Sequence, residues 1–134
     1  MSKLSDIEGI GDTYASKLER VDIHTLADLL KACSDPKGRR TTAHQTGISE
    51  KLILGWVNRA DLARINGIST QYADLLEYAG VDTVPELAQR KADSLRAKMV
   101  EVNDERKLVR QLPGLSQLED WIQQAKTLPR IISH

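Results

Sequence analysis

An internal repeat limits the folds open to this chain more than any other feature. Residues 7–32 align with residues 65–90 at an offset of 58, and nine of the 26 paired positions are identical. Unrelated segments of this length would share about one or two identities, so we interpret the match as a duplication. A chain of 134 residues therefore contains two similar halves, which we place at residues 1–59 and 60–134.

The pattern of apolar residues predicts an all-α fold. No stretch alternates apolar and polar residues over the length of a strand. Each half contains a Trp among apolar residues at helical spacing, which favours a core role for both: Ile53, Trp56, Val57 and Ala60, then Leu118, Trp121, Ile122 and Ala125. We expect each half to contain a hairpin unit followed by two further helices, packed as one compact domain, with an extended and frayed tail over residues 128–134.

Polar residues indicate where several helices begin and end. Three Ser or Thr residues are followed three positions later by an acid, which is the spacing of a capping box: Thr25 with Asp28, Thr83 with Glu86, and Ser116 with Glu119. Asp35 before Pro36 predicts another helix start, because proline is favoured in a first turn. Helix ends are expected at Gly47, Gly80 and Asn103.

The repeated unit has glycines and apolar residues at fixed spacing. The two sets are Leu4, Ile7, Gly9, Ile10, Gly11, Ala15 and Leu18, and Leu62, Ile65, Gly67, Ile68, Ser69, Ala73 and Leu76. The first glycine of each set permits a tight turn, and the helix that follows leaves backbone N–H groups unpaired at its start, which favours an anion there. The pattern resembles the helix-hairpin-helix signature, from which the second copy departs only at Ser69. The resemblance implies that these N–H groups bind nucleic-acid phosphate.

The whole chain also resembles a family of small bacterial-type proteins with tandem helix-hairpin-helix units, catalogued as a domain of unknown function. Residues 46–65 and 97–122 are similar to the connecting and C-terminal regions of that family. The resemblance implies the fold. It leaves two functions open, because a helix-hairpin-helix also serves as a protein-interaction element.

Charge is balanced over the whole chain but not along it. The formal net charge is zero, which excludes a strongly basic nucleic-acid-binding body. Residues 1–36, 37–64, 65–89 and 90–134 carry net charges of −3, +4, −4 and +3, so the hairpin units are acidic and the intervening helices are basic. Lys37, Arg39 and Arg40 form the densest basic cluster. Arg106, Lys107 and Arg110 are expected to share a second helical patch.

The two turns differ in the charges around them. Asp6, Glu8 and Asp12 surround the first turn, and Asp12 can itself complement the helix N-terminus in place of a phosphate. No acid follows the second turn until Asp74, and Ser69 there either caps the helix or donates to phosphate. The predicted nucleic-acid contacts are Arg64, Gly67, Ile68, Ser69, Thr70, Lys37, Arg39 and Arg40. The first turn is a weaker candidate: Gly9, Ile10 and Gly11.

No pattern in the sequence indicates catalysis, a metal or a cofactor. His24, His44 and His134 lack metal-ligand spacing, and the single cysteine, Cys33, allows no internal disulfide. No signal peptide or membrane span is visible, so a cytoplasmic location is expected. The sequence predicts a non-enzymatic protein that binds nucleic acid, DNA in particular, without sequence preference. The alternative is a protein–protein interaction module or homodimeric scaffold that uses the same hairpins.

Overall fold

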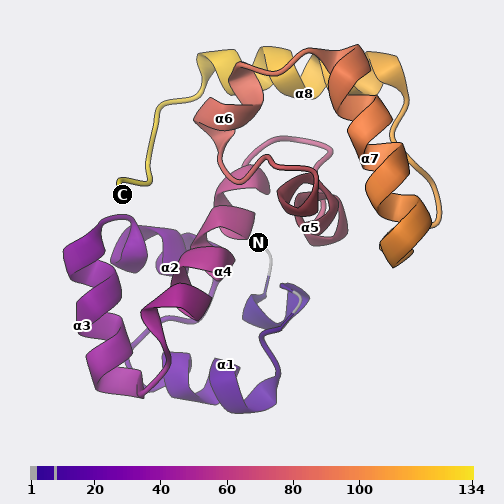
Figure 1. The fold of residues 1–134 in the computed structure, drawn as a ribbon. Coiled ribbons are helices and arrows are strands. Elements are labelled where there is room, and N and C mark those ends of the chain that lie inside the picture. Colours follow the sequence, from indigo (N-terminus) through magenta and orange to yellow (C-terminus); the bar gives the residue numbers. More distant parts are fainter. Residues whose placement is uncertain (1–2, 8) are drawn as a thin grey trace. The chain divides into compact units, whose positions relative to one another are not determined.

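The structure, a computed structural model, describes residues 3–7 and 9–134 and is α-helical (Figure 1). Over these residues a 3₁₀ turn, η1 (Leu4–Asp6), precedes eight helices: α1 (Asp12–Glu19), α2 (Leu26–Cys33), α3 (Pro36–Thr46), α4 (Glu50–Leu62), α5 (Thr70–Tyr78), α6 (Val84–Ala88), α7 (Ala92–Arg106) and α8 (Leu115–Thr127). The described part of the chain contains no strand beyond an isolated bridge between Lys3 and Thr25. The all-α prediction is confirmed. None of the described helices has the length and apolar character needed to cross a membrane.

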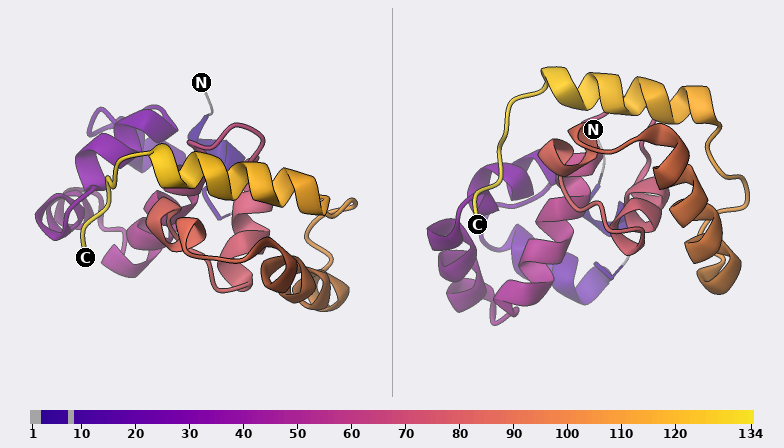
Figure 2. Two further views of the ribbon diagram at one scale, coloured as in Figure 1. Left: turned by 90° about the horizontal axis from the view of Figure 1, so that it is seen from above. Right: turned by 45° about the horizontal axis from the view of Figure 1, so that its top comes forward.

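Contacts within the chain divide it into two compact units. Unit 1 comprises Met1–Asp61 together with Ile131–His134, and unit 2 comprises Leu62–Arg130. The division made from the sequence, after residue 59, falls inside α4, whose last residue opens unit 2. In unit 2, α8 packs against α6 and α7, as the views in Figures 1 and 2 show.

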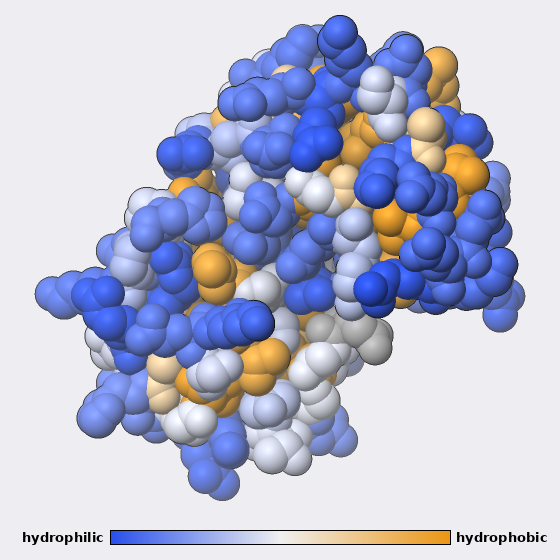
Figure 3. Space-filling view, viewed as in Figure 1, coloured by the Kyte–Doolittle hydropathy of each residue, from blue (hydrophilic) through white to orange (hydrophobic). Residues whose placement is uncertain are grey.

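Each unit has its own, mostly aliphatic core that contains one tryptophan. Trp56 is 2% exposed in the core of unit 1, and Trp121 is 1% exposed in the core of unit 2. The core role predicted for both residues is confirmed. Polar and charged residues cover most of the face drawn in Figure 3, with hydrophobic residues in smaller patches.

The repeated segments have the same local structure. Gly9 and Gly67 both have a positive φ, +94° and +100°. The same backbone hydrogen bonds recur at the offset of 58, from Ile10 to Ile7 and from Ile68 to Ile65, each 3.1 Å long. Each tryptophan also packs on a tyrosine from the repeat, Trp56 on Tyr14 with ring centroids 5.2 Å apart and Trp121 on Tyr72 at 5.3 Å. The two tryptophans therefore pack behind equivalent turns.

The predicted starts of α2 and α3 are confirmed. Thr25 Oγ1 accepts the Asp28 N–H at 3.1 Å, and the Asp28 carboxylate accepts the Thr25 N–H at 3.2 Å, which completes a capping box. The hydrogen bonds from the His24 and Thr25 N–H groups lower the pKa of Asp28. Asp35 caps α3 by accepting the Gly38 N–H at 2.7 Å.

The predicted start of α6 is confirmed, because Thr83 is its N-cap, but no side-chain capping box forms there and Glu86 instead pairs with Arg90 at 2.9 Å. Two other predicted helix boundaries are wrong. The N-cap of α8 is Gly114, so Ser116 lies inside the first turn. Asn103 lies within α7, which continues to Arg106 because Lys107 takes the left-handed conformation, with a φ of 54°.

Asp22 occupies the repeat position that is Gly80 in the second copy, and both residues have positive φ, 65° and 96°. Glycine adopts this conformation without steric cost, whereas aspartate is only tolerated there. We expect Asp22→Gly to raise the melting temperature of unit 1 by about 2–5 °C. Thermal unfolding followed by circular dichroism measures the change. Asp22→Ala is the matched control and should lower the melting temperature. If Asp22→Gly lowers it as well, the positive φ at position 22 is not what limits the stability of unit 1.

Candidate functional site

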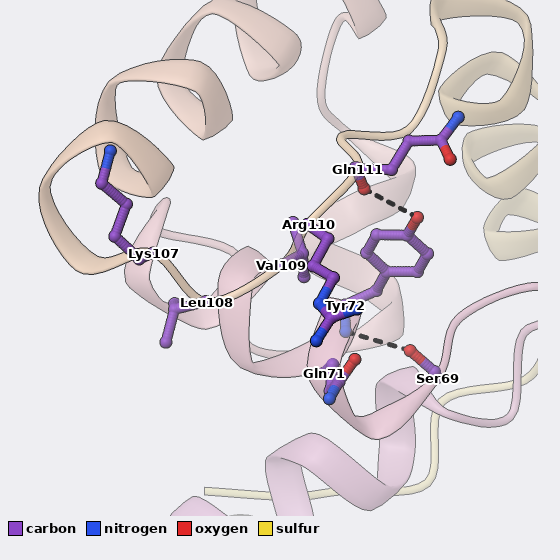
Figure 4. A pocket seen from close by; sticks show the side chains of 8 residues that line it. All are labelled: Ser69, Gln71, Tyr72, Lys107, Leu108, Val109, Arg110 and Gln111. Atoms are coloured by element: carbon purple, nitrogen blue, oxygen red, sulfur yellow. Dashed lines mark hydrogen bonds between the residues drawn. The ribbon is translucent and has the colours of Figure 1, made fainter.

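A cleft of about 520 Å³ opens beside the start of α5 in unit 2 (Figure 4). One wall is the first turn of α5, and the other is the loop that follows α7. The residues that line it are Ser69, Gln71, Tyr72, Lys107, Leu108, Val109, Arg110 and Gln111. Two of these side chains are cationic and none is acidic, so the lining favours an anion.

The N-terminal end of α5, which borders the cleft, carries backbone N–H groups without intrahelical acceptors. Ser69 is the N-cap, and its Oγ accepts the Tyr72 N–H at 3.2 Å. The N–H groups of Thr70 and Gln71 precede the first intrahelical hydrogen bond and have no acceptor within residues 3–7 and 9–134. These N–H groups carry the positive end of the helix dipole. Ser69 therefore acts as a cap, and two donors remain beside it.

The loop that carries Arg110 is fixed on both sides of that residue. The Asn103 side chain donates to the Val109 carbonyl at 3.1 Å and accepts the Val109 N–H at 3.0 Å. On the other side, the Tyr72 hydroxyl donates to the Gln111 carbonyl at 3.0 Å. Arg110 extends between these two anchors toward Gln71 at the start of α5 (Figure 4). Its position is thus set by hydrogen bonds from two different helices.

The predicted contacts of the second turn all lie in unit 2, but they differ in accessibility. Gly67 and Ser69 are exposed, whereas the Ile68 side chain is only 5% exposed, so Ile68 can contribute only its backbone. Thr70 is half-buried. Arg64 is half-buried too, and its guanidinium donates to the Pro129 carbonyl at 2.9 Å.

The basic cluster on α3 is not a uniform surface. Lys37 and Arg40 are exposed, but Arg39 is 5% exposed inside unit 1. Its guanidinium donates to the carbonyls of Cys33, Ser34 and Ser133 at 3.1, 3.2 and 2.8 Å. Arg39 therefore holds unit 1 together rather than facing a ligand, and we correct its predicted role as a contact.

The first turn presents a different chemistry from the second. Gly9 and Gly11 are exposed and Ile10 is buried. Gly11 provides no side-chain cap for α1, and the exposed Asp12 is the first residue of that helix, where its charge complements the helix dipole. Glu8, which the sequence places in the same acidic group, lies outside the described residues.

Sequence reasoning grouped Arg106 with Lys107 and Arg110 on one helical face, and this grouping is wrong. Arg106 is the last residue of α7, and its guanidinium lies 3.9 Å from the centre of the Tyr78 ring. Lys107 ends the helix and Arg110 lies in the following loop, so only these two line the cleft. The signal that sequence reasoning missed is Asn103, whose side chain binds the loop instead of ending α7.

The chain matches the domain of unknown function DUF4332 over residues 8–128. The match covers most of its length, so this all-α protein belongs to that family. Comparison with curated proteins gave no match, and neither did comparison with solved structures. Within the described residues, no three His, Cys, Asp or Glu side chains are grouped where they could hold a metal ion.

Proposed function

We propose that this protein binds nucleic acid, DNA in particular, through its backbone phosphates and without sequence preference, and that it has no catalytic role. The observation that carries the proposal is the cleft beside α5, which two cations and no acid line. A phosphate accepts hydrogen bonds from backbone N–H groups and from Arg and Lys side chains. Lys107 and Arg110 line the cleft, and residues of the first turn of α5 border it. Contacts of this kind position a protein on DNA without identifying bases.

The place of the cleft in the repeat supports the same function. It adjoins the second repeated turn, whose sequence resembles a helix-hairpin-helix, and that motif binds phosphate through the N–H groups at this end of the helix. We propose a tandem pair of such hairpins, in which the second makes the phosphate contact. Lys37 and Arg40 on α3 are proposed as additional phosphate contacts, since both side chains are exposed.

The first hairpin is proposed to be structural. Asp12 occupies the start of α1, where it would repel a phosphate. The corresponding position of the second copy is Thr70, which carries no charge. This difference supports the proposal that, of the two turns, the second contacts phosphate.

Titration of labelled single- and double-stranded DNA tests this function. If two to four phosphates are contacted, raising the salt concentration from about 50 to 200 mM should weaken binding by about 10- to 100-fold, because counterions return to the DNA. Two duplexes of unrelated sequence should bind with the same affinity at each salt concentration. If no binding to DNA or RNA is detected at about 50 mM salt, the proposal is wrong.

A further inference from the structure

The last four residues bind back to unit 1 and are not frayed, contrary to the prediction for this tail. Ile132 is 3% exposed and belongs to the core of unit 1. The Ser133 N–H donates to the Ser34 carbonyl at 2.8 Å, and the Ser133 carbonyl accepts Arg39 Nη2 at 2.8 Å. In Figure 1 the chain ends beside α2 and α3. The buried Ile132 side chain and two hydrogen bonds to the main chain of Ser133 thus hold this segment on unit 1.

The groups of unit 1 that bind residues 131–134 form a seat for this segment. Hydrogen bonds within unit 1 that do not include the segment hold the seat in place. Arg39 Nη1 donates to the carbonyls of Cys33 and Ser34, which end α2 and lack intrahelical partners. These two bonds orient the guanidinium, so that Nη2 is directed at a carbonyl of whatever segment lies there. The Ser34 carbonyl supplies the matching acceptor.

Unit 1 contacts the main chain of residues 131–134 and only one of their apolar side chains. Ile131 is 37% exposed, and Ser133 and His134 are exposed, so Ile132 is the only side chain of the four that is buried. Any extended peptide with a branched apolar residue, followed by a residue with a free N–H, can make the same contacts. Recognition through main-chain hydrogen bonds and one side-chain pocket is a general mode of peptide binding.

We propose that residues 131–134 are a releasable strap, and that their seat between α2 and α3 is a binding site for an extended peptide of a partner protein with Ile or Val at the Ile132 position. The strap and the partner peptide compete for Arg39 and the Ser34 carbonyl. The site lies in unit 1 and is independent of the proposed phosphate cleft in unit 2.

Cys33 provides a readout of the seat. It is the only cysteine of the chain, it is fully buried, and it shares the core of unit 1 with Ile132. Burial raises the pKa of its thiol, which opposes formation of the reactive thiolate. Release of the strap opens this part of the core, so modification by a thiol reagent should become faster.

Two adjacent isoleucines give a matched pair of full-length variants. Ile132→Asp should raise the rate of Cys33 modification by about tenfold or more, because it expels the strap. Ile131→Asp makes the same charge change at an exposed position and should modify at the wild-type rate. Ile132→Ala should show a smaller increase, and it serves as the test if circular dichroism shows that Ile132→Asp is unfolded. Equal rates for the variants at positions 131 and 132 would overturn the proposal.

A peptide added in trans tests the partner site directly. The probe is the sequence of residues 128–134 with blocked ends, and its control carries Ile132→Asp. At about 1 mM, the probe should return the modification rate of a folded Ile132 variant to within about threefold of wild type, since a single anchor gives weak affinity. The control peptide should have no effect. If the probe gives no protection, the seat does not bind peptides and the proposal is wrong.

Discussion

Gly67→Ala is expected to lower the free energy of unfolding of unit 2 by about 2–4 kcal/mol, whereas Gly9→Ala should lower that of unit 1 by only about 1–2 kcal/mol. Both glycines have a positive φ, so alanine is strained at either position. The two differ in what a Cβ atom would meet. At Gly67 it would lie 2.7 Å from Trp121 Nε1, and at Gly9 it would lie 3.5 Å from Trp56 Nε1.

The contact at Gly67 is costly because Trp121 has little room to move. Trp121 is 1% exposed, and its ring packs against Tyr72 at 5.3 Å. The Tyr72 hydroxyl is itself bonded to the loop that carries Arg110. A displaced Trp121 therefore disturbs the core and the cleft together, which adds an overpacking term to the backbone strain.

The two tryptophans allow each unit to be followed separately. They are the only ones in the chain, and one lies in each core. Urea unfolding of Gly67→Ala is followed by Trp121 fluorescence in a Trp56→Phe background, and that of Gly9→Ala by Trp56 fluorescence in a Trp121→Phe background. Each midpoint is compared with that of its own background. If the two substitutions lower the free energy of unfolding equally, Trp121 moves away from the added Cβ atom without an energetic penalty, and the prediction is wrong.

The features that could be predicted from the sequence are those decided within a few residues. The tight turns at Gly9 and Gly67 follow from the local spacing of the repeat, and both glycines have a positive φ. Capping by Asp35 also depends only on its nearest neighbours. A duplication strengthened these predictions, since each local pattern could be checked against its second copy.

The features that could not be predicted depend on distant partners. Arg39 and Arg40 carry the same charge and are adjacent in the chain, but Arg39 is buried, and one acceptor of its guanidinium is a carbonyl 94 residues away, that of Ser133. Arg110 enters the cleft because the Asn103 amide and the Tyr72 hydroxyl fix its loop, and neither bond has a sequence pattern. Charge density along the sequence singled out Lys37, Arg39 and Arg40, whereas the two cations that line the cleft are Lys107 and Arg110.

Reversal of both cleft charges, Lys107→Glu with Arg110→Glu, is expected to weaken DNA binding by about 100-fold at low salt. The reason is the loss of two charge-assisted contacts and the repulsion of the phosphate by two new acids. The slope of log affinity against log salt should also become shallower by about 2, one for each lost phosphate contact. The loss should be the same for unrelated sequences, because phosphate contacts carry no base information.

The matched control is Lys98→Glu with Arg130→Glu, which makes the same change in net charge within unit 2. Both residues are exposed and neither lines the cleft; the surface pair of Lys98 with Glu101, at 3.7 Å, contributes little stability. The control should keep most of the affinity. Lys37→Glu with Arg40→Glu tests the contribution of α3, and Arg39 is left unchanged because its reversal would place an acid against three carbonyls. If the control loses as much affinity as the cleft variant, binding reflects net charge and the cleft is not the site.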